Sequence, residues 1–222
     1  MVNKVKPVVE PVVEPVVEAK VKAKKADTLG EVATLTKKRN FMINDLMKTN
    51  KKLSKEEATQ IVDNSIVETT KRGVEPVEMY SLMKSESSGN PNVKHAVLPE
   101  DKGVDHGLMG VNEMYHYETL TKSDIPEFRG KSQKEIGALL EDPALNIKAA
   151  AYIYANIPKK GTPNKYIAWK GDNKKGKENA KVAHKMFEKD STELAKQEGV
   201  KVEVQEYTVL NDVAATIGNV VS

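Results

Sequence analysis

Helix-start signals recur along this chain and constrain its fold more than any other feature. Ser54 with Glu57 and Ser132 with Glu135 have the spacing of capping boxes, in which two side chains satisfy the free N–H groups at a helix start. Apolar residues follow both boxes at helical spacing. Each box therefore predicts the start of an amphipathic helix.

Three further segments have the pattern of helices. Pro76 suits a first helical turn, and the helix it begins is expected to run to about Ser87. A second helix is expected from Asp142 until before Pro158, and a Lys-rich helix over about 177–197. The sequence thus predicts a mainly α protein. The turn-rich segment over 89–112 is long for a connection, and such loops are uncommon unless they are functional.

The two ends of the chain differ from the middle. Residues 1–26 hold three Pro-Val-Val-Glu units, and proline at every fourth position predicts an extended, polyproline-like tail without stable structure. Such a tail could be a solvated spacer or a tether to a larger assembly. Residues 27–199 are expected to form the folded domain. In 200–222, valines alternate with other residues as in a short strand.

Composition excludes several classes of protein. Cysteine is absent, which excludes a disulfide scaffold and any Cys-ligated metal site. Lys and Arg total 35 against 32 Asp and Glu, so no nucleic-acid partner is expected. No apolar run approaches the roughly 18 residues of a membrane span. The four histidines lack the spacing of a zinc-binding helix, and neither a metal nor a cofactor is expected.

One carboxyl group stands out for its position. Met79, Leu82, Met83 and Glu86 fall on one face of the helix that begins at Pro76, with Glu86 at its C-terminal end. Desolvation and the negative end of the helix dipole would both raise the pKa of this glutamate. A raised pKa suits a general acid near neutral pH. The alternative is that Glu86 lies in water at a frayed helix end.

Three segments, in order, resemble the motifs of lytic transglycosylases and their lysozyme-fold relatives. Residues 86–92 read ESSGNPN, residues 107–111 read GLMGV, and residues 142–152 read DPALNIKAAAY. The resemblance covers roughly 74–172. It implies a lysozyme-like helical domain that cuts the β-1,4 bond between N-acetylmuramic acid and N-acetylglucosamine in peptidoglycan, with Glu86 as the catalytic acid.

The resemblance and the aromatic residues also provide candidates for contact with glycan strands. These candidates are Ser87, Gly107, Leu108, Met109, Tyr115, Asn146, Tyr152 and Trp169. Ser87 could instead cap the helix end, and the aromatic residues could instead belong to the core. Two positions depart from the family pattern: the glutamine after Leu-Met is Gly110, and the asparagine of the A-Y-N motif is Lys170.

Residues 101–111, DKGVDHGLMGV, are also similar to a stretch of goose-type lysozymes. In those enzymes, aspartates at the positions of Asp101 and Asn112 are held to activate water. Two mechanisms stay open here. Glu86 alone could form a 1,6-anhydro sugar, as a transglycosylase does, or Asp101 could direct a water in an inverting hydrolysis. The amide at Asn112 favours the transglycosylase.

The N-terminus lacks the apolar segment and cleavage site of a secretory signal. A wall-degrading enzyme would then need another route, and a phage particle provides one. We therefore expect a virion-associated enzyme that acts on the host cell wall during genome entry, with the N-terminal tail contacting other virion proteins. The competing reading is a structural virion protein with a degenerate lysozyme fold.

Overall fold

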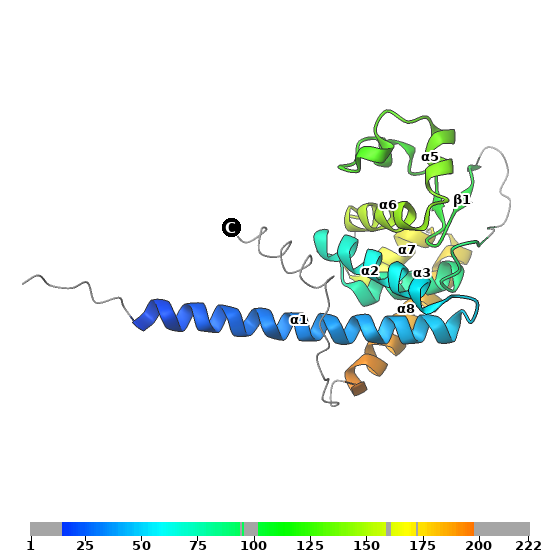
Figure 1. Ribbon diagram of the computed structural model, residues 1–222. Coiled ribbons are helices and arrows are strands. Elements are labelled where there is room, and N and C mark those ends of the chain that lie inside the picture. Colours follow the sequence, from blue (N-terminus) through cyan, green and yellow to red (C-terminus); the bar gives the residue numbers. More distant parts are fainter. Residues whose placement is uncertain (1–14, 94, 96–101, 159–160, 172, 198–222) are drawn as a thin grey trace, which may run out of the picture. The chain divides into compact units, whose positions relative to one another are not determined.

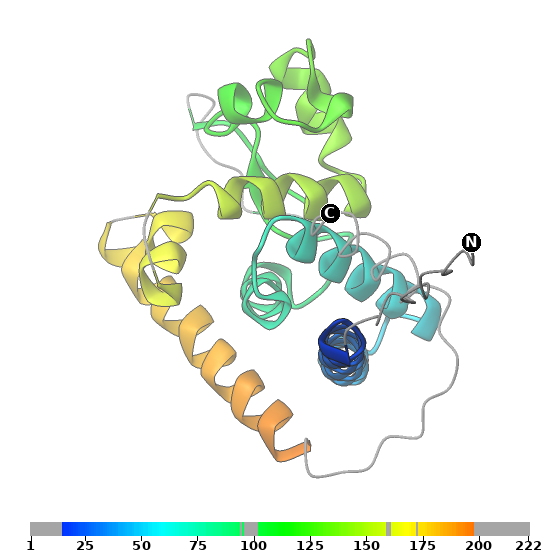
Figure 2. The same cartoon turned by 90° about the vertical axis from the view of Figure 1, so that its left-hand side faces the viewer.

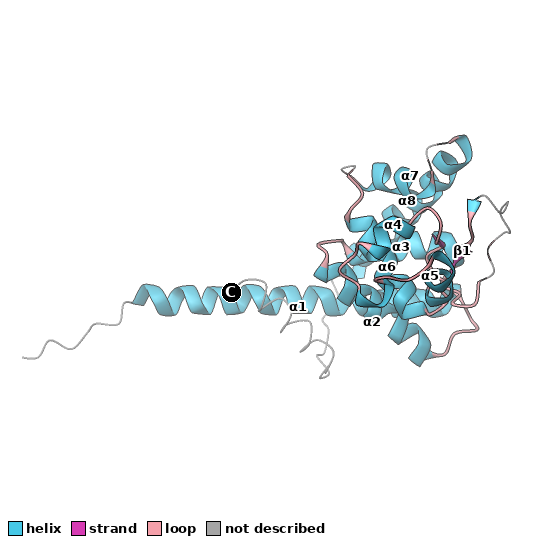
Figure 3. Ribbon diagram, turned by 90° about the horizontal axis from the view of Figure 1, so that it is seen from above, coloured by secondary structure: helices cyan, strands magenta, loops and turns pink. Residues whose placement is uncertain are grey.

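The computed structural model describes residues 15–93, 95, 102–158, 161–171 and 173–197, and these residues form mainly helices (Figures 1 and 3). The elements are α1 (Pro15–Thr49), α2 (Lys55–Lys71), α3 (Pro76–Ser87), β1 (Asp105–His106), β2 (Val111–Asn112), α4 (Tyr117–Thr121), the 3-10 helix η2 (Pro126–Phe128), α5 (Gln133–Leu139), α6 (Pro143–Ala155), α7 (Thr162–Lys170) and α8 (Lys174–Gln197).

The chain divides into two compact units, residues 1–35 and 36–222, with the division inside α1. The described part of the first unit is the N-terminal part of α1. The second unit holds all the other elements. No helix in the described parts of the chain is both long and apolar enough to cross a bilayer.

The expected helix starts are confirmed. At α2 the N–H of Glu57 donates to Ser54 Oγ over 3.1 Å, and the N–H of Ser54 donates to Glu57 Oε2 over 2.8 Å. The same reciprocal pair forms between Ser132 and Glu135 at the start of α5. These helices begin where the sequence predicts because the side chains that satisfy the free N–H groups lie within the first turn.

Helix α3 lies at the centre of the second unit. Figure 2 looks roughly along it, with α2, α6, α7 and α8 arranged around it. Its apolar residues Met79, Leu82 and Met83 are at most 1 % exposed, and the helix packs against α2 and α8. Helix α6 packs on α2, and α5 lies on the opposite side of α6 (Figures 1 and 2).

A buried polar cluster fixes α3 to its neighbours near the C-terminal end. Lys84 Nζ lies 2.6 Å from Asp45 Oδ2 on α1 and 2.7 Å from Asp190 Oδ1 on α8. The hydroxyls of Tyr80 and Ser81 donate to the same two carboxylates. One cation between two carboxylates ties three helices together and sets the position of the last turn of α3.

A short hairpin interrupts the helices. Strands β1 and β2 pair antiparallel, with Asp105 opposite Asn112, and residues 107–110 form the turn. Gly107 has φ +62°, and a Cβ there would lie within 2.7 Å of the Asn146 side chain and the Leu140 carbonyl. Only glycine fits this backbone shape and this close approach.

The structure bears on part of what was expected at the two chain ends. Helix α1 begins at Pro15, so residues 15–26 are helical although an extended tail was expected over 1–26. Proline is tolerated in a first helical turn, where its missing N–H would have no partner, and no further proline interrupts the chain before Pro76. Residues 1–14 and the strand expected in 200–222 lie outside the described residues.

We predict that residues 1–26 are dispensable for folding and for the peptidoglycan cleavage that the motif resemblance implies. Their composition cannot supply a core, and Phe41 is the first buried apolar side chain among the residues whose burial is described. A chain that begins at Asp27 should melt cooperatively and digest peptidoglycan at the rate of the full chain. An unfolded or inactive shortened chain would place the domain boundary before Asp27.

Candidate active site

Glu86 lies in the last turn of α3, and its side chain is 16 % exposed. Its Oε1 atom accepts a hydrogen bond of 2.8 Å from Trp169 Nε1 and lies 2.9 Å from Lys170 Nζ. Burial raises the pKa of Glu86, and this effect exceeds the opposing effects of Lys170, Trp169 and His95. The apolar stripe therefore holds a carboxyl group whose neutral form is favoured.

Helix α7 brings the two donors to this carboxyl group, because Trp169 and Lys170 are its last two residues. The hydroxyl of Tyr166 on α7 donates to the Glu78 carbonyl of α3 over 2.6 Å, which fixes one helix on the other. The indole of Trp169 stacks on His116, with ring centroids 6.1 Å apart and planes at 22°. Burial lowers the pKa of His116. Trp169 thus positions Glu86 in addition to offering an aromatic surface.

The second carboxyl oxygen faces the hairpin turn. A Cβ on Gly110 would lie 3.3 Å from Glu86 Oε2 and 3.2 Å from His95 Cε1. His95 Nε2 is in turn 2.8 Å from the Gly107 carbonyl. Because position 110 has no side chain, Oε2 faces the Gly110 backbone beside the His95 ring.

A single buried amide supports this turn. Asn146 on α6 is fully buried, and its Oδ1 accepts from the N–H of Met109 over 2.8 Å. Its Nδ2 donates to the carbonyls of His106 and Leu140 over 2.8 and 2.9 Å. The arrangement fixes the turn that lies against Glu86.

The transglycosylase SLT domain family model matches residues 63–191, which is more than half of the chain. This chain belongs to the transglycosylase SLT domain family. No curated protein and no solved structure matches the chain significantly. The match runs from α2 into α8 and includes Glu86, the hairpin turn, Trp169 and Lys170. Membership implies a lysozyme-like fold and a peptidoglycan substrate.

Several expected glycan contacts have structural partners in this SLT domain. The Ser87 hydroxyl donates to the Met83 carbonyl and accepts from the Gly89 N–H, as a helix-end hydroxyl does. Leu108 and Met109 are at most 1 % exposed and belong to the core. Together with Gly107 and Asn146, they build the support of the site.

The aromatic candidates are placed differently from one another. Tyr115 follows β2 and is 66 % exposed, so its ring is free to meet a large ligand. Tyr152 on α6 is half-buried, and the Arg72 guanidinium lies 5.0 Å from its ring centroid. Of the three aromatic candidates, Trp169 contacts Glu86 directly.

The second goose-type position is fully engaged in the hairpin. Asn112 Nδ2 donates to the Lys102 carbonyl and to Asp105, and Asn112 Oδ1 accepts from the N–H groups of Met114 and Tyr115. An amide held in this way cannot act as a base. Asp101 lies outside the described residues.

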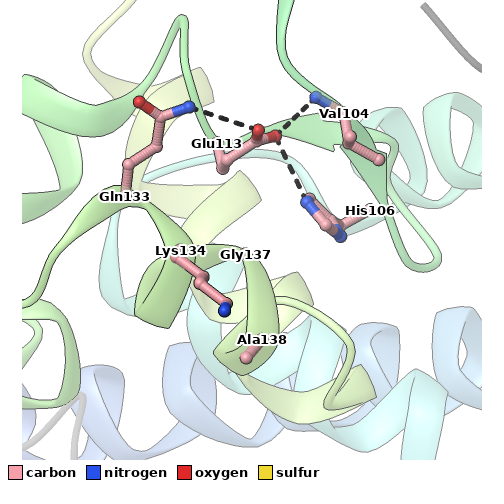
Figure 4. Close-up of a pocket in the computed structure, with 7 residues that line it drawn as sticks. All are labelled: Val104, His106, Glu113, Gln133, Lys134, Gly137 and Ala138. Carbon is pink, nitrogen blue, oxygen red and sulfur yellow. Dashed lines mark hydrogen bonds and ion pairs between the residues drawn. The ribbon is translucent and has the colours of Figure 1, made fainter. Parts of the chain in front are cut away.

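A cavity of about 450 Å³ lies beside the hairpin and α5 in the SLT domain (Figure 4). Its lining consists of Val104, His106, Glu113, Gln133, Lys134, Gly137 and Ala138. Glu113 Oε2 accepts from the Val104 N–H over 2.7 Å and lies 3.2 Å from His106 Nε2. Glu86 does not line this cavity. No group of three or more acidic or His side chains in the described part of the chain is arranged to hold a metal ion.

Sequence reasoning missed two neighbours of Glu86, His95 and Lys170. It interpreted the histidines only as possible metal ligands, and Lys170 only as the loss of an amide. One signal pointed to such a neighbour: a carboxylate on an apolar stripe requires a donor or a cation, and no such partner lies on its own helix face.

Proposed function

We propose that this SLT domain is a peptidoglycan lytic transglycosylase and that Glu86 acts alone as its acid and base. The observation that supports this role is that the two oxygens of the Glu86 carboxyl group have different neighbours. Oε1 faces two nitrogen donors, so the proton of the neutral acid belongs on Oε2. Burial raises the pKa of Glu86 and so favours the protonated form more than water does.

The reaction follows from one carboxyl group in two roles. The Oε2 proton passes to the glycosidic oxygen as the C1–O bond of the muramic acid breaks. The resulting Glu86 carboxylate then takes the proton of the C6 hydroxyl, and O6 bonds to C1 to give the 1,6-anhydro sugar. The nucleophile is part of the bound sugar, so the second step is intramolecular and needs no activated water.

The alternative is an inverting hydrolysis with Asp101 as the base. It requires a carboxylate that directs a water to the opposite face of the sugar. Position 112 is an amide, which is not a base, so Asp101 is the sole remaining goose-type candidate. The loss of one of the two carboxylates favours the transglycosylase over the lysozyme.

Product masses separate the two reactions. After digestion of purified peptidoglycan, anhydro ends and free reducing ends differ in mass by one water. We expect anhydro ends, and only a mild loss of rate in Asp101→Asn, because the C6 hydroxyl needs no second carboxylate. Reducing ends, together with a loss of about 10²-fold or more in Asp101→Asn, would favour the hydrolase instead. Undigested peptidoglycan would favour a glycan-binding structural protein.

We further propose that a phage particle carries this enzyme to the host cell wall. The Pro-Val-Val-Glu repeat supports this placement, since a repeat of that composition does not build a core and suits an arm within an assembly. Mass spectrometry of purified particles should detect the chain at a constant ratio to the major structural proteins. Its presence in the lysate but not in particles would contradict the placement.

A further inference from the structure

Two helix C-termini meet at Glu86. The glutamate lies in the last turn of α3, and Lys170 is the last residue of α7. The C-terminal end of each helix carries a partial negative charge, which disfavours a carboxylate and favours a cation. The positive charge of Lys170 lies beside Glu86 at the ends of α3 and α7. It therefore offsets the partial negative charge of both helix ends and the charge of the carboxylate.

The ammonium of Lys170 is held in place rather than free in solvent. Its side chain is 9 % exposed, and Nζ lies 2.9 Å from Glu86 Oε1. Gly171 follows with φ +93°, and a Cβ on Gly176 would overlap the carbonyls of residues 170 and 171. The start of α8 therefore packs tightly on the end of α7. The ammonium is held against Glu86 Oε1, an oxygen that can accept whether or not Oε2 carries a proton.

We propose that Lys170 is a positioning residue for the catalytic acid and takes the place of the amide of the family's A-Y-N motif; this rests on the proposed role of Glu86. Its ammonium fixes Oε1, which directs the Oε2 proton toward Gly110 in the hairpin turn. It also stabilises the carboxylate that forms when Glu86 gives its proton to the leaving oxygen.

Lys170 acts on both the pKa of Glu86 and the rate of proton donation. Its removal should raise the pKa but lower the rate, so the two effects can be measured separately. An ammonium binds a carboxylate more strongly than it binds a neutral carboxyl group, so Lys170 lowers the pKa of Glu86 against the effect of burial. Without Lys170, Glu86 should stay protonated to higher pH. Proton donation should nevertheless be slower, because the new carboxylate loses its cation.

The experiment follows the ¹³C NMR resonance of the Glu86 carboxyl carbon as a function of pH, in the full chain without glycan. The resonance is assigned as the one that is missing from the spectrum of Glu86→Gln. In Lys170→Met the pKa of Glu86 should rise by about one pH unit or more. The basic limb of kcat/KM should move up by the same amount while kcat falls. Lys170→Arg should titrate near the wild-type value, because it keeps the charge.

A matched control is Lys175→Met, which removes the same charge from an exposed position on α8 and should leave the titration unchanged. His95 is the other titratable side chain that acts on Glu86, so the titration is repeated in His95→Gln, where the effect of Lys170→Met should persist.

An unchanged titration of Glu86 in Lys170→Met would overturn the proposal. If that variant does not fold, Lys170→Asn replaces it; this variant restores the family amide without the charge and is expected to raise the pKa in the same way. The titration requires no turnover. Activity retained by Glu86→Gln would therefore refute the proposed acid, and it would do so independently of whether Lys170 controls the carboxyl group.

Discussion

Replacing Glu86 by Gln should slow the cleavage of peptidoglycan by at least about 10²-fold and leave the fold intact. An amide cannot give up a proton to the leaving oxygen, and the loss of a general acid costs about 10²–10⁴-fold in rate. The Gln carbonyl oxygen can still accept from Trp169 and Lys170, so the end of α3 keeps its partners. Clearing of a peptidoglycan suspension measures the rate, and a thermal melt checks the fold.

Glu118→Gln is the matched control for that variant. Glu118 lies on α4, and its side chain is 82 % exposed, so the same change of charge should leave the rate unaltered. Clearing by Glu86→Gln at the wild-type rate would show that another group is the acid.

Replacing Asn146 by Ala should destabilise the protein more than any change on the surface of α6. Its side-chain amide accepts a hydrogen bond from the Met109 N–H and donates to the carbonyls of His106 and Leu140. Because Asn146 is fully buried, water cannot replace these bonds at its position. Loss of these partners should lower the free energy of unfolding by about 3 kcal/mol, at about 1 kcal/mol for each group. Urea denaturation measures the change.

The control is Asn156→Ala at the end of the same helix. Asn156 is exposed, and its amide donates only to the Tyr152 carbonyl one turn earlier, so the change should stay within about 0.5 kcal/mol. Equal losses in the two variants would show that the turn holds its shape without Asn146. Slower cleavage by Asn146→Ala at a temperature where it remains folded would connect the turn to the site.

The sequence determined several helix starts and the position of the candidate acid. Capping boxes at Ser54 and Ser132 and a proline at residue 76 predicted helix starts that the structure confirms. The spacing of Met79, Leu82, Met83 and Glu86 predicted a carboxyl group on a buried face, and burial does raise its pKa. These signals depend on residues within a few positions of one another, so they can be recognised in the sequence alone.

Only the tertiary structure decided what surrounds that carboxyl group. Trp169 is 83 residues from Glu86 in the sequence, and the contact between them depends on how α7 packs on α3. The same packing turns Lys170, which the sequence presented as a lost amide, into the cation on Oε1. It also makes Asn146 a buried support for the turn. Helix periodicity fixes which face a residue occupies, but the side chain it meets is set by the packing of helices far apart in the chain.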